Sequence, residues 1–414
     1  MRGKIALSGP RLLLYKLRTG GIVWLGERLR EEIELPRTSL GQSLFRAVRG
    51  VARVVQGRPG REAVGAGSSD VLYAFYDLGV APITFDFLWF LVGAELERQR
   101  RGSVSIHAVI VPGRRAGLRK ENPELEKSLD PPARWARVHA ILTPACALLP
   151  SLSGVTVASS RAQAEQLLTV AGEAVFPASY EPGLPCYTGP HEPLRAAREE
   201  GARVAALRAT VADLRAIDDW LAARQCDRRL VTITLRSYNY APARNSNIPA
   251  WTAFARSLDP DRFSVVFVPD TAQCIGGLPG ELRDFTICAE AAMVVGLRMA
   301  LYQQAYLNLG VNTGPMGLCW LNDQTRYITF KILTDAIPNT TAEYMEFLGF
   351  EPGKLLPFAT PGQQWVWAED EFEIIKDAFS AMVMRLEGSA DQAEQDRASR
   401  CGGASLIASA TSAG

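Results

Sequence analysis

The sequence predicts an α/β protein with two domains, each built on a mostly parallel β-sheet. The chain has 414 residues, which is long for one hydrophobic core, because single cores stop growing near ~250–300 residues. Short apolar runs alternate with segments of helical periodicity on both sides of a stretch at 192–225 that is rich in Ala, Arg, Leu and Glu. Strands that alternate with helices in this way are typical of βαβ units and parallel sheets.

The first domain is expected over residues 70–191. Its strands are predicted at 71–76, 104–111 and 154–158, and Thr84 or Asp86 can cap a helix that runs to about Arg101.

Residues 192–229 are predicted to form a helical connection, and residues 230–387 a second domain. Apolar runs at 230–235 and 263–268 are its first strands, and a helix between them carries a stripe of Trp251, Phe254 and Leu258. A further helix is expected over 289–307.

The two ends of the chain differ from these domains. Residues 1–69 are predicted to be a basic helical segment and linker, since residues 1–62 hold 13 Lys and Arg against 5 Glu, a net charge of +8. Such a segment can lie on an anionic membrane surface; the alternative is that its helices pack on the protein and leave their arginines in water. Residues 388–414 lack periodicity and are expected to be a disordered tail.

Composition excludes several classes of protein. The net charge of +1 gives no reason to expect nucleic acid as a partner, and no apolar run reaches the ~18–20 residues of a membrane span. Seven cysteines without a C-x-x-C pair favour a reduced cytoplasmic location. Membrane contact of the basic segment would place the protein peripherally at the inner membrane face. The three histidines lie in different segments, so neither a metal nor a bound cofactor is expected.

A polar loop follows the first strand of the second domain. It holds Arg236, Arg244, Asn245 and Asn247 at the strand end where parallel sheets bind ligands; the alternative is an ordinary solvated connection. Asp270 ends the next strand and could touch a ribose or sugar hydroxyl, or cap a turn.

A second candidate feature is the turn Asn312-Thr313-Gly314 after a short apolar run. A helix start here would aim free N–H groups at an anion, and Gly314 would let the backbone approach a phosphate. Arg236 and Arg244 could make bidentate contacts to the same group. The two features together predict a diphosphate site.

These motifs resemble those of GT-B type glycosyltransferases, and they are closest to the heptosyltransferase-like branch that builds lipopolysaccharide cores in bacterial cell envelopes. The basic loop residue Arg244 precedes Trp251, as in that family, and Thr313-Gly314 matches a donor turn of the form Asp-Thr-Gly-x-x-His. Asn312 and Gly317 stand where the family has Asp and His, which leaves the donor open. Arg298 is similar to a position in fucosyltransferase-like members.

The resemblance implies two Rossmann-like domains facing a cleft and an enzyme that moves a sugar from a nucleotide-activated donor to a glycan or lipid-linked acceptor without a metal. It implies that Asp77, after the first strand, is the general base; the alternative is that Asp77 only stabilises its turn. Asp86 and Glu95 are the substitutes should Asp77 fail. A non-catalytic nucleotide- or sugar-binding protein and a nucleotide-sugar epimerase are the competing functions.

Overall fold

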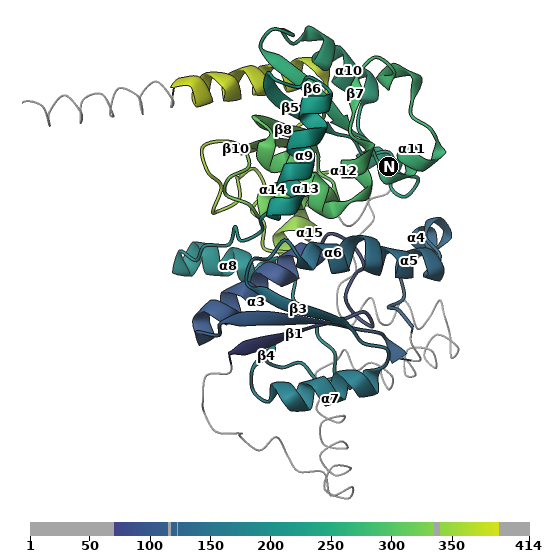
Figure 1. Cartoon of the computed structure of the whole chain (residues 1–414), viewed down its shortest axis with the longest axis vertical. Helices are drawn as coiled ribbons and strands as arrows, with labels where there is room; N and C mark the ends of the chain where they lie inside the picture. Colours follow the sequence, from purple (N-terminus) through teal and green to yellow (C-terminus); the bar gives the residue numbers. More distant parts are fainter. Residues whose placement is uncertain (1–69, 115–116, 122, 335–339, 389–414) are drawn as a thin grey trace, which may run out of the picture.

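A computed structural model describes residues 70–114, 117–121, 123–334 and 340–388. The basic segment predicted at 1–69 and the tail from 389 onward lie outside the described residues. Within the described part of the chain the strands form two sheets in which every strand pair is parallel. The predicted α/β class with parallel sheets is therefore confirmed (Figure 1).

The first sheet has the strand order β3-β2-β1-β4. Its strands are β1 (Val71–Asp77), β2 (Ser105–Val111), β3 (Leu152–Val157) and β4 (Val175–Phe176). One face packs against helix α3 (Phe87–Arg101), and the other packs against α7 (Arg161–Ala171). Figure 1 shows α3 on the side of this sheet that faces the second domain and α7 on the far side. Ser160 caps α7 by accepting from Gln163 N, and Gly102 ends α3 in the left-handed conformation at φ 69°.

The second sheet has the strand order β10-β9-β8-β5-β6-β7. Its strands are β5 (Arg229–Thr234), β6 (Phe263–Val268), β7 (Thr286–Ile287), β8 (Leu307–Val311), β9 (Tyr327–Phe330) and β10 (Gln363–Trp365). The chain builds outward from β5 in one direction and then returns to add β8 on the other side of β5. This is the doubly wound order of nucleotide-binding domains, and its direction reverses between β5 and β8.

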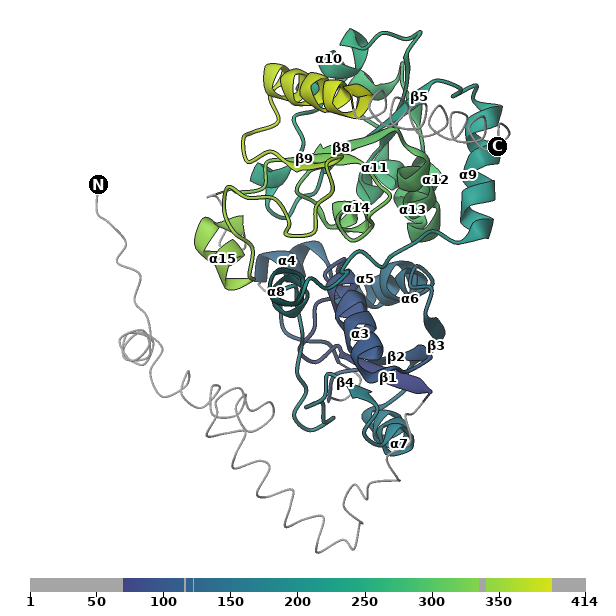
Figure 2. The same ribbon diagram turned by 90° about the vertical axis from the view of Figure 1, so that its left-hand side faces the viewer.

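Helices cover both faces of the second sheet (Figure 2). One face packs against α10 (Ile248–Ser257) and the helix at 372–388. The other packs against α9 (Val211–Ala223), α12 (Ala289–Met293) and α13 (Val295–Gln304). Trp251 and Phe254 of α10 are fully buried, as the stripe predicts, whereas Leu258 lies at the end of the helix and is only partly buried.

The remaining helices connect these layers or lie between the domains. They are α4 (Pro123–Ser128), α5 (Pro131–Arg137), a π-helical turn at Val138–Leu142, α6 (Thr143–Cys146), α8 (His191–Glu200), α11 (Thr271–Gly276), α14 (Gly317–Trp320) and α15 (Ala342–Phe347), with 3₁₀ turns at Pro242–Arg244, Gly280–Leu282 and Gly314–Met316. The helix expected over 289–307 is divided at Val294, which has the extended angles φ −116° and ψ 114°.

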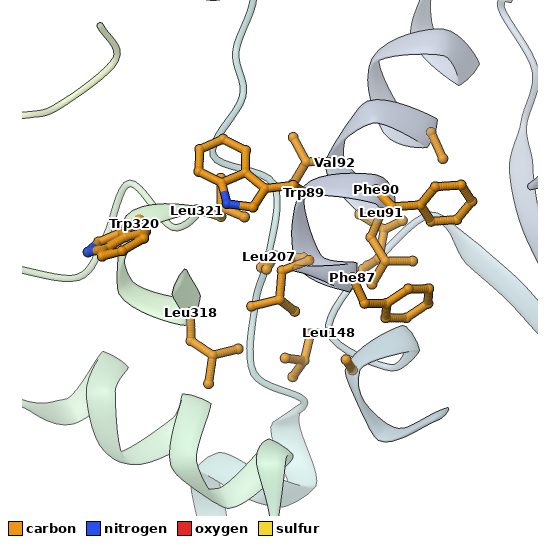
Figure 3. Packing of buried hydrophobic residues seen from close by; sticks show 14 of the residues in the cluster. Phe87, Trp89, Phe90, Leu91, Val92, Leu148, Leu207, Leu318, Trp320 and Leu321 are labelled. Carbon is orange, nitrogen blue, oxygen red and sulfur yellow. The ribbon is translucent and has the colours of Figure 1, made fainter. Parts of the chain in front are cut away.

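A continuous apolar cluster joins the two domains. It contains residues of β1, β2 and α3 together with Leu318, Trp320 and Leu321 of the second domain. Leu207 belongs to the segment that connects the domains, and Figure 3 shows it lying between α3 and these second-domain residues. Its backbone N–H donates to Leu321 O at 3.1 Å. The domains therefore share a core as well as a linker. No helix in the described residues is long and apolar enough to cross a membrane.

Candidate functional site

The predicted loop and turn meet at the reversal point of the second sheet. The loop at 237–247 follows β5, and the turn at 312–317 follows the neighbouring strand β8. Arg244 Nη2 donates to the carbonyl oxygen of Asn312 at 2.9 Å, so one bond bridges the two strand ends. Doubly wound sheets bind ligands at this crevice.

Arg236 holds the loop in shape from within. Its side chain is buried and donates to Ala241 O at 3.0 Å, to Tyr240 O at 2.7 Å and to the Asn245 side chain. The Asn245 amide also closes on the backbone of Tyr238, accepting at 3.1 Å and donating at 3.2 Å. Burial, followed by the nearby charge of Arg244, lowers the pKa of Arg236 to about 10. Arg236 and Asn245 therefore build the loop in this structure, and their contact with a ligand stays a prediction.

Three other predicted donor residues are also engaged within the protein. Asn247 caps α10 by accepting from Ala250 N at 3.3 Å. Asp270 caps α11 in a reciprocal pair with Gln273, which is the capping alternative stated above, and it also accepts from Ser237 N at 3.3 Å. Arg298 is buried and donates to the last carbonyls of α12, at 2.7 and 3.0 Å. The Nε and Nη2 atoms of Arg298 are therefore engaged inside the protein, and its contact with a donor stays a prediction.

Two residues that sequence reasoning missed support the same loop. Lys331, just after β9, has the left-handed angle φ 54°, pairs with Glu369 at 2.7 Å and donates to Asn245 O at 3.4 Å. Asp370 is buried and accepts from Asn247 N at 2.7 Å and Trp251 Nε1 at 2.8 Å. A non-glycine residue held at positive φ costs free energy and is often found at functional sites. Neither β9 nor β10 was predicted, so no sequence signal placed these residues at the site.

Asp77, the predicted general base, is enclosed by partners from the first domain. Its side chain is fully buried. Arg161 of α7 donates to both of its oxygens, at 3.0 and 2.8 Å. Tyr180 Oη and Gly79 N donate to it as well, at 3.0 and 2.9 Å. The alternative reading, in which Asp77 stabilises its turn, agrees with this geometry, and a base role would require Arg161 and Tyr180 to release the carboxylate.

Asp86 lies nine residues after Asp77 in the chain, and its carboxylate is exposed at the domain junction. It stands at the start of α3 without a capping bond from its side chain, and it accepts from Thr84 Oγ1 at 2.7 Å. Burial lowers the pKa of Arg244 while the charge of Asp86 raises it. Phe85, the neighbour of Asp86, lies against Gly314, and Arg244 bonds the carbonyl of Asn312 in the same turn. Burial and then Asp86 likewise raise the pKa of Tyr344 on α15. Glu95, the other substitute, lies in the middle of α3 and is paired with Arg98 at 2.7 Å.

The turn after β8 lies against the first domain. A Cβ on Gly314 would come within 3.0 Å of the Phe85 ring, so the glycine permits close approach of Phe85 in this structure. The Asn312 side chain is committed to Ile332 O at 2.8 Å, while Thr313 is partly exposed and Gly314 exposed. The turn continues into a 3₁₀ turn and the four-residue helix α14. The candidate site is thus Asp86, Arg244 and the turn 312–314.

The described part of the chain holds no group of three or more His, Cys, Asp or Glu side chains that could bind a metal ion.

No protein-family model and no curated protein sequence matches this chain. Among solved structures, it is similar to the glycosyl transferase family 9 protein from Veillonella parvula, with a TM-score of 0.47 and 10% identity over 76% of this chain and 97% of that one. It is similar to E. coli ADP-heptose lps heptosyltransferase II, with a TM-score of 0.42 and 8% identity over 77% and 99%. It is similar to the fucosyltransferase NodZ from Bradyrhizobium, with a TM-score of 0.28 and 12% identity over 61% of this chain and 93% of that one.

Heptosyltransferase-like and fucosyltransferase-like proteins, which the sequence resembles, are thus among the solved structures that are similar to this chain. One fold supports many activities. At such low identity the function of this chain has to be argued from its own residues.

Proposed function

We propose that this protein is a metal-independent glycosyltransferase that moves a sugar from a nucleotide-activated donor to an acceptor hydroxyl. The observation that carries the proposal is the meeting of the two domains at the turn 312–314. Phe85, the neighbour of Asp86, lies against Gly314 of this turn, and Arg244 donates to Asn312 O at 2.9 Å. A carboxylate and a guanidinium at the reversal point of a doubly wound sheet are the two charges that glycosyl transfer needs.

Arg244 and the turn would hold the donor diphosphate. Arg244 is half-buried and keeps a backbone partner at Asn312, so its guanidinium is already oriented, and a planar donor fork suits phosphate oxygens. As the bond between the anomeric carbon and the diphosphate oxygen breaks, its electron pair passes to that oxygen. Arg244 would stabilise this developing charge, and no metal ion is needed for that role.

Asp86 would act as the general base. The acceptor hydroxyl must lose its proton as its oxygen bonds to the anomeric carbon, and a carboxylate that a substrate can reach must receive that proton. Asp86 is exposed and Asp77 is fully buried, so Asp86 is the better candidate. We therefore assign the general base to Asp86, at the start of α3, instead of to Asp77, which the resemblance implies.

A second candidate is a binding protein that keeps the donor site without transfer. The sealed Asp77–Arg161 pair favours it, because the residue expected to be the base is unavailable.

Two substitutions separate these proposals. Arg244→Ala should weaken nucleoside diphosphate binding by about 1.5–3 kcal/mol, the scale of a charge-assisted hydrogen bond. Asp86→Asn should leave that affinity unchanged and lower turnover of a nucleotide-sugar by about 10²–10⁴. Arg283→Ala and Asp284→Asn, exposed positions on another loop, are the matched controls. Calorimetry that finds equal affinity for Arg244→Ala removes Arg244 from the site, and binding without turnover of any donor supports the binding protein.

The acceptor is proposed to be a glycan or a lipid-linked glycan, reached through peripheral contact of residues 1–62 with an anionic membrane. Their net charge of +8, from 13 basic and 5 acidic residues, supports this by attraction to anionic lipid. Co-sedimentation with anionic but not neutral liposomes, lost on deletion of the segment, is the expected result. Equal sedimentation with both lipids would refute it.

A further inference from the structure

A pocket with both polar and apolar walls opens between the two domains, and its lining ends one residue before Arg244 of the candidate site. It has a volume of about 450 Å³ and is lined from the first domain by Glu124, Lys127 and Ser128 of α4, and from the second by residues 239–243. Arg244 comes next in the chain after this lining. The backbone N–H of Arg244 also donates to the carbonyl oxygen of Ala241 in the pocket wall at 3.1 Å, so the pocket lies beside the proposed diphosphate site.

We propose that this pocket binds a neutral sugar unit of the acceptor. This inference rests on the proposed function and names a substrate class for it. The volume lies at the small end of ligand pockets, which span ~300–1,000 Å³, and suits one or two sugar rings.

The chemistry of the lining fits a neutral polyhydroxy ligand. Glu124 and Lys127 contribute one negative and one positive charge, so the pocket has no excess of positive charge to attract a phosphate. Carboxylate, ammonium, hydroxyl and amide groups together offer both donors and acceptors, and sugar hydroxyls need both. Tyr240 and Pro242 add flat apolar surface against which the C–H face of a sugar ring can pack.

The second-domain wall of the pocket is built before any ligand arrives. Arg236 donates to the carbonyls of Tyr240 and Ala241, at 2.7 and 3.0 Å. Ala241 itself is held at φ 56°, a conformation that costs a non-glycine residue free energy. A preformed wall lowers the entropy lost on binding, so the internal bonds of Arg236 serve this pocket and Arg244 alike.

The test is saturation-transfer NMR on the full chain. The probes are the methyl glycosides of glucose, galactose and mannose, with methyl glucuronide as the charged comparison. At least one neutral glycoside should bind, and Tyr240→Ala should weaken it about three- to ten-fold, as expected for one lost aromatic contact. Glu124→Gln should also weaken it. Phe347→Ala and Glu343→Gln, exposed on α15, are the matched controls and should leave binding unchanged.

The outcomes separate this inference from the proposed function. The pocket is supported if a neutral glycoside stays bound when a nucleoside diphosphate is added and binds more weakly to the Tyr240→Ala variant. This result does not depend on how the Arg244→Ala variant binds the diphosphate. Absence of neutral glycoside binding, binding of the glucuronide alone, or equal binding by Tyr240→Ala overturns it. If the Arg244 and Asp86 variants then behave as predicted, transfer stands and its acceptor lies elsewhere.

Discussion

Replacement of Asp77 should damage the stability of the first domain rather than its chemistry. The carboxylate is fully buried and accepts four hydrogen bonds, two of them from Arg161 at 3.0 and 2.8 Å. Asp77→Ala would leave the Arg161 guanidinium, with a side chain only 19% exposed, without its counter-charge. Truncating one member of a buried ion pair costs about 3–5 kcal/mol. Asp77→Asn keeps an oxygen for Gly79 N but loses the charge, so a loss of about 1.5–3 kcal/mol is expected.

Urea unfolding followed by tryptophan fluorescence measures these losses. Asp86→Asn is the matched control and should change stability by less than about 0.5 kcal/mol, since its side chain is exposed. Arg161→Met combined with Asp77→Ala should cost less than the sum of the single changes, because neither partner is then left unpaired. Wild-type stability in Asp77→Asn, together with lost turnover, would refute this reasoning and restore Asp77 as the base.

Two further changes test the roles assigned to buried charges. Arg298→Met should lower the free energy of unfolding by about 1.5–3 kcal/mol, because carbonyls at the end of α12 lose a charged donor, and calorimetry should find unchanged nucleoside diphosphate affinity; a large affinity loss in a stable variant would instead place Arg298 at the donor. Burial raises the pKa of Glu95, but hydrogen bonds from Arg98, Ser151 and Gln99 outweigh it, so the pKa lies below its ordinary value of 4.5. A lowered folded pKa gives stability that is present above the unfolded pKa and is lost as pH falls through the folded one. Wild-type stability should therefore drop below pH 4.5 more steeply than that of Glu95→Gln, and equal slopes in acid titrations of unfolding would contradict the role of Glu95.

The fold class could be predicted because local periodicity carries it. Apolar runs such as 263–268 and the stripe of Trp251 and Phe254 have the spacing of a strand and of a helix, whatever the rest of the chain does. Strands β7 and β10 escaped prediction because they are two and three residues long, too short to show a period. The break at Val294 was also missed, since no Gly or Pro stands at that position and the nearby Gly296 lies inside α13.

The meeting of the two polar segments could be predicted, but the partners of each residue could not. Polar residues after β5 and β8 do meet at the reversal point, as the rule for parallel sheets requires. Asn247 and Asp270 nevertheless cap helices. The residue types that cap helices also bind sugars and phosphates, so the sequence alone does not separate the two roles. Asp77 and Asp86 differ through Arg161, which lies 84 residues from Asp77 in the chain. Sequence spacing alone cannot reveal such a partner.

The same apolar contact positions both halves of the candidate site. Helix α3 begins just after Asp86, and α14 begins three residues after Gly314. The two helices touch, since a Cβ on Gly317 would lie 3.4 Å from the Leu88 side chain, and both belong to the cluster that joins the domains. A close-packed core transmits small shifts instead of absorbing them. The separation of Asp86 from the turn 312–314 is therefore set by the α3–α14 contact, and the strongly apolar start of α3 serves the candidate site as well as the fold.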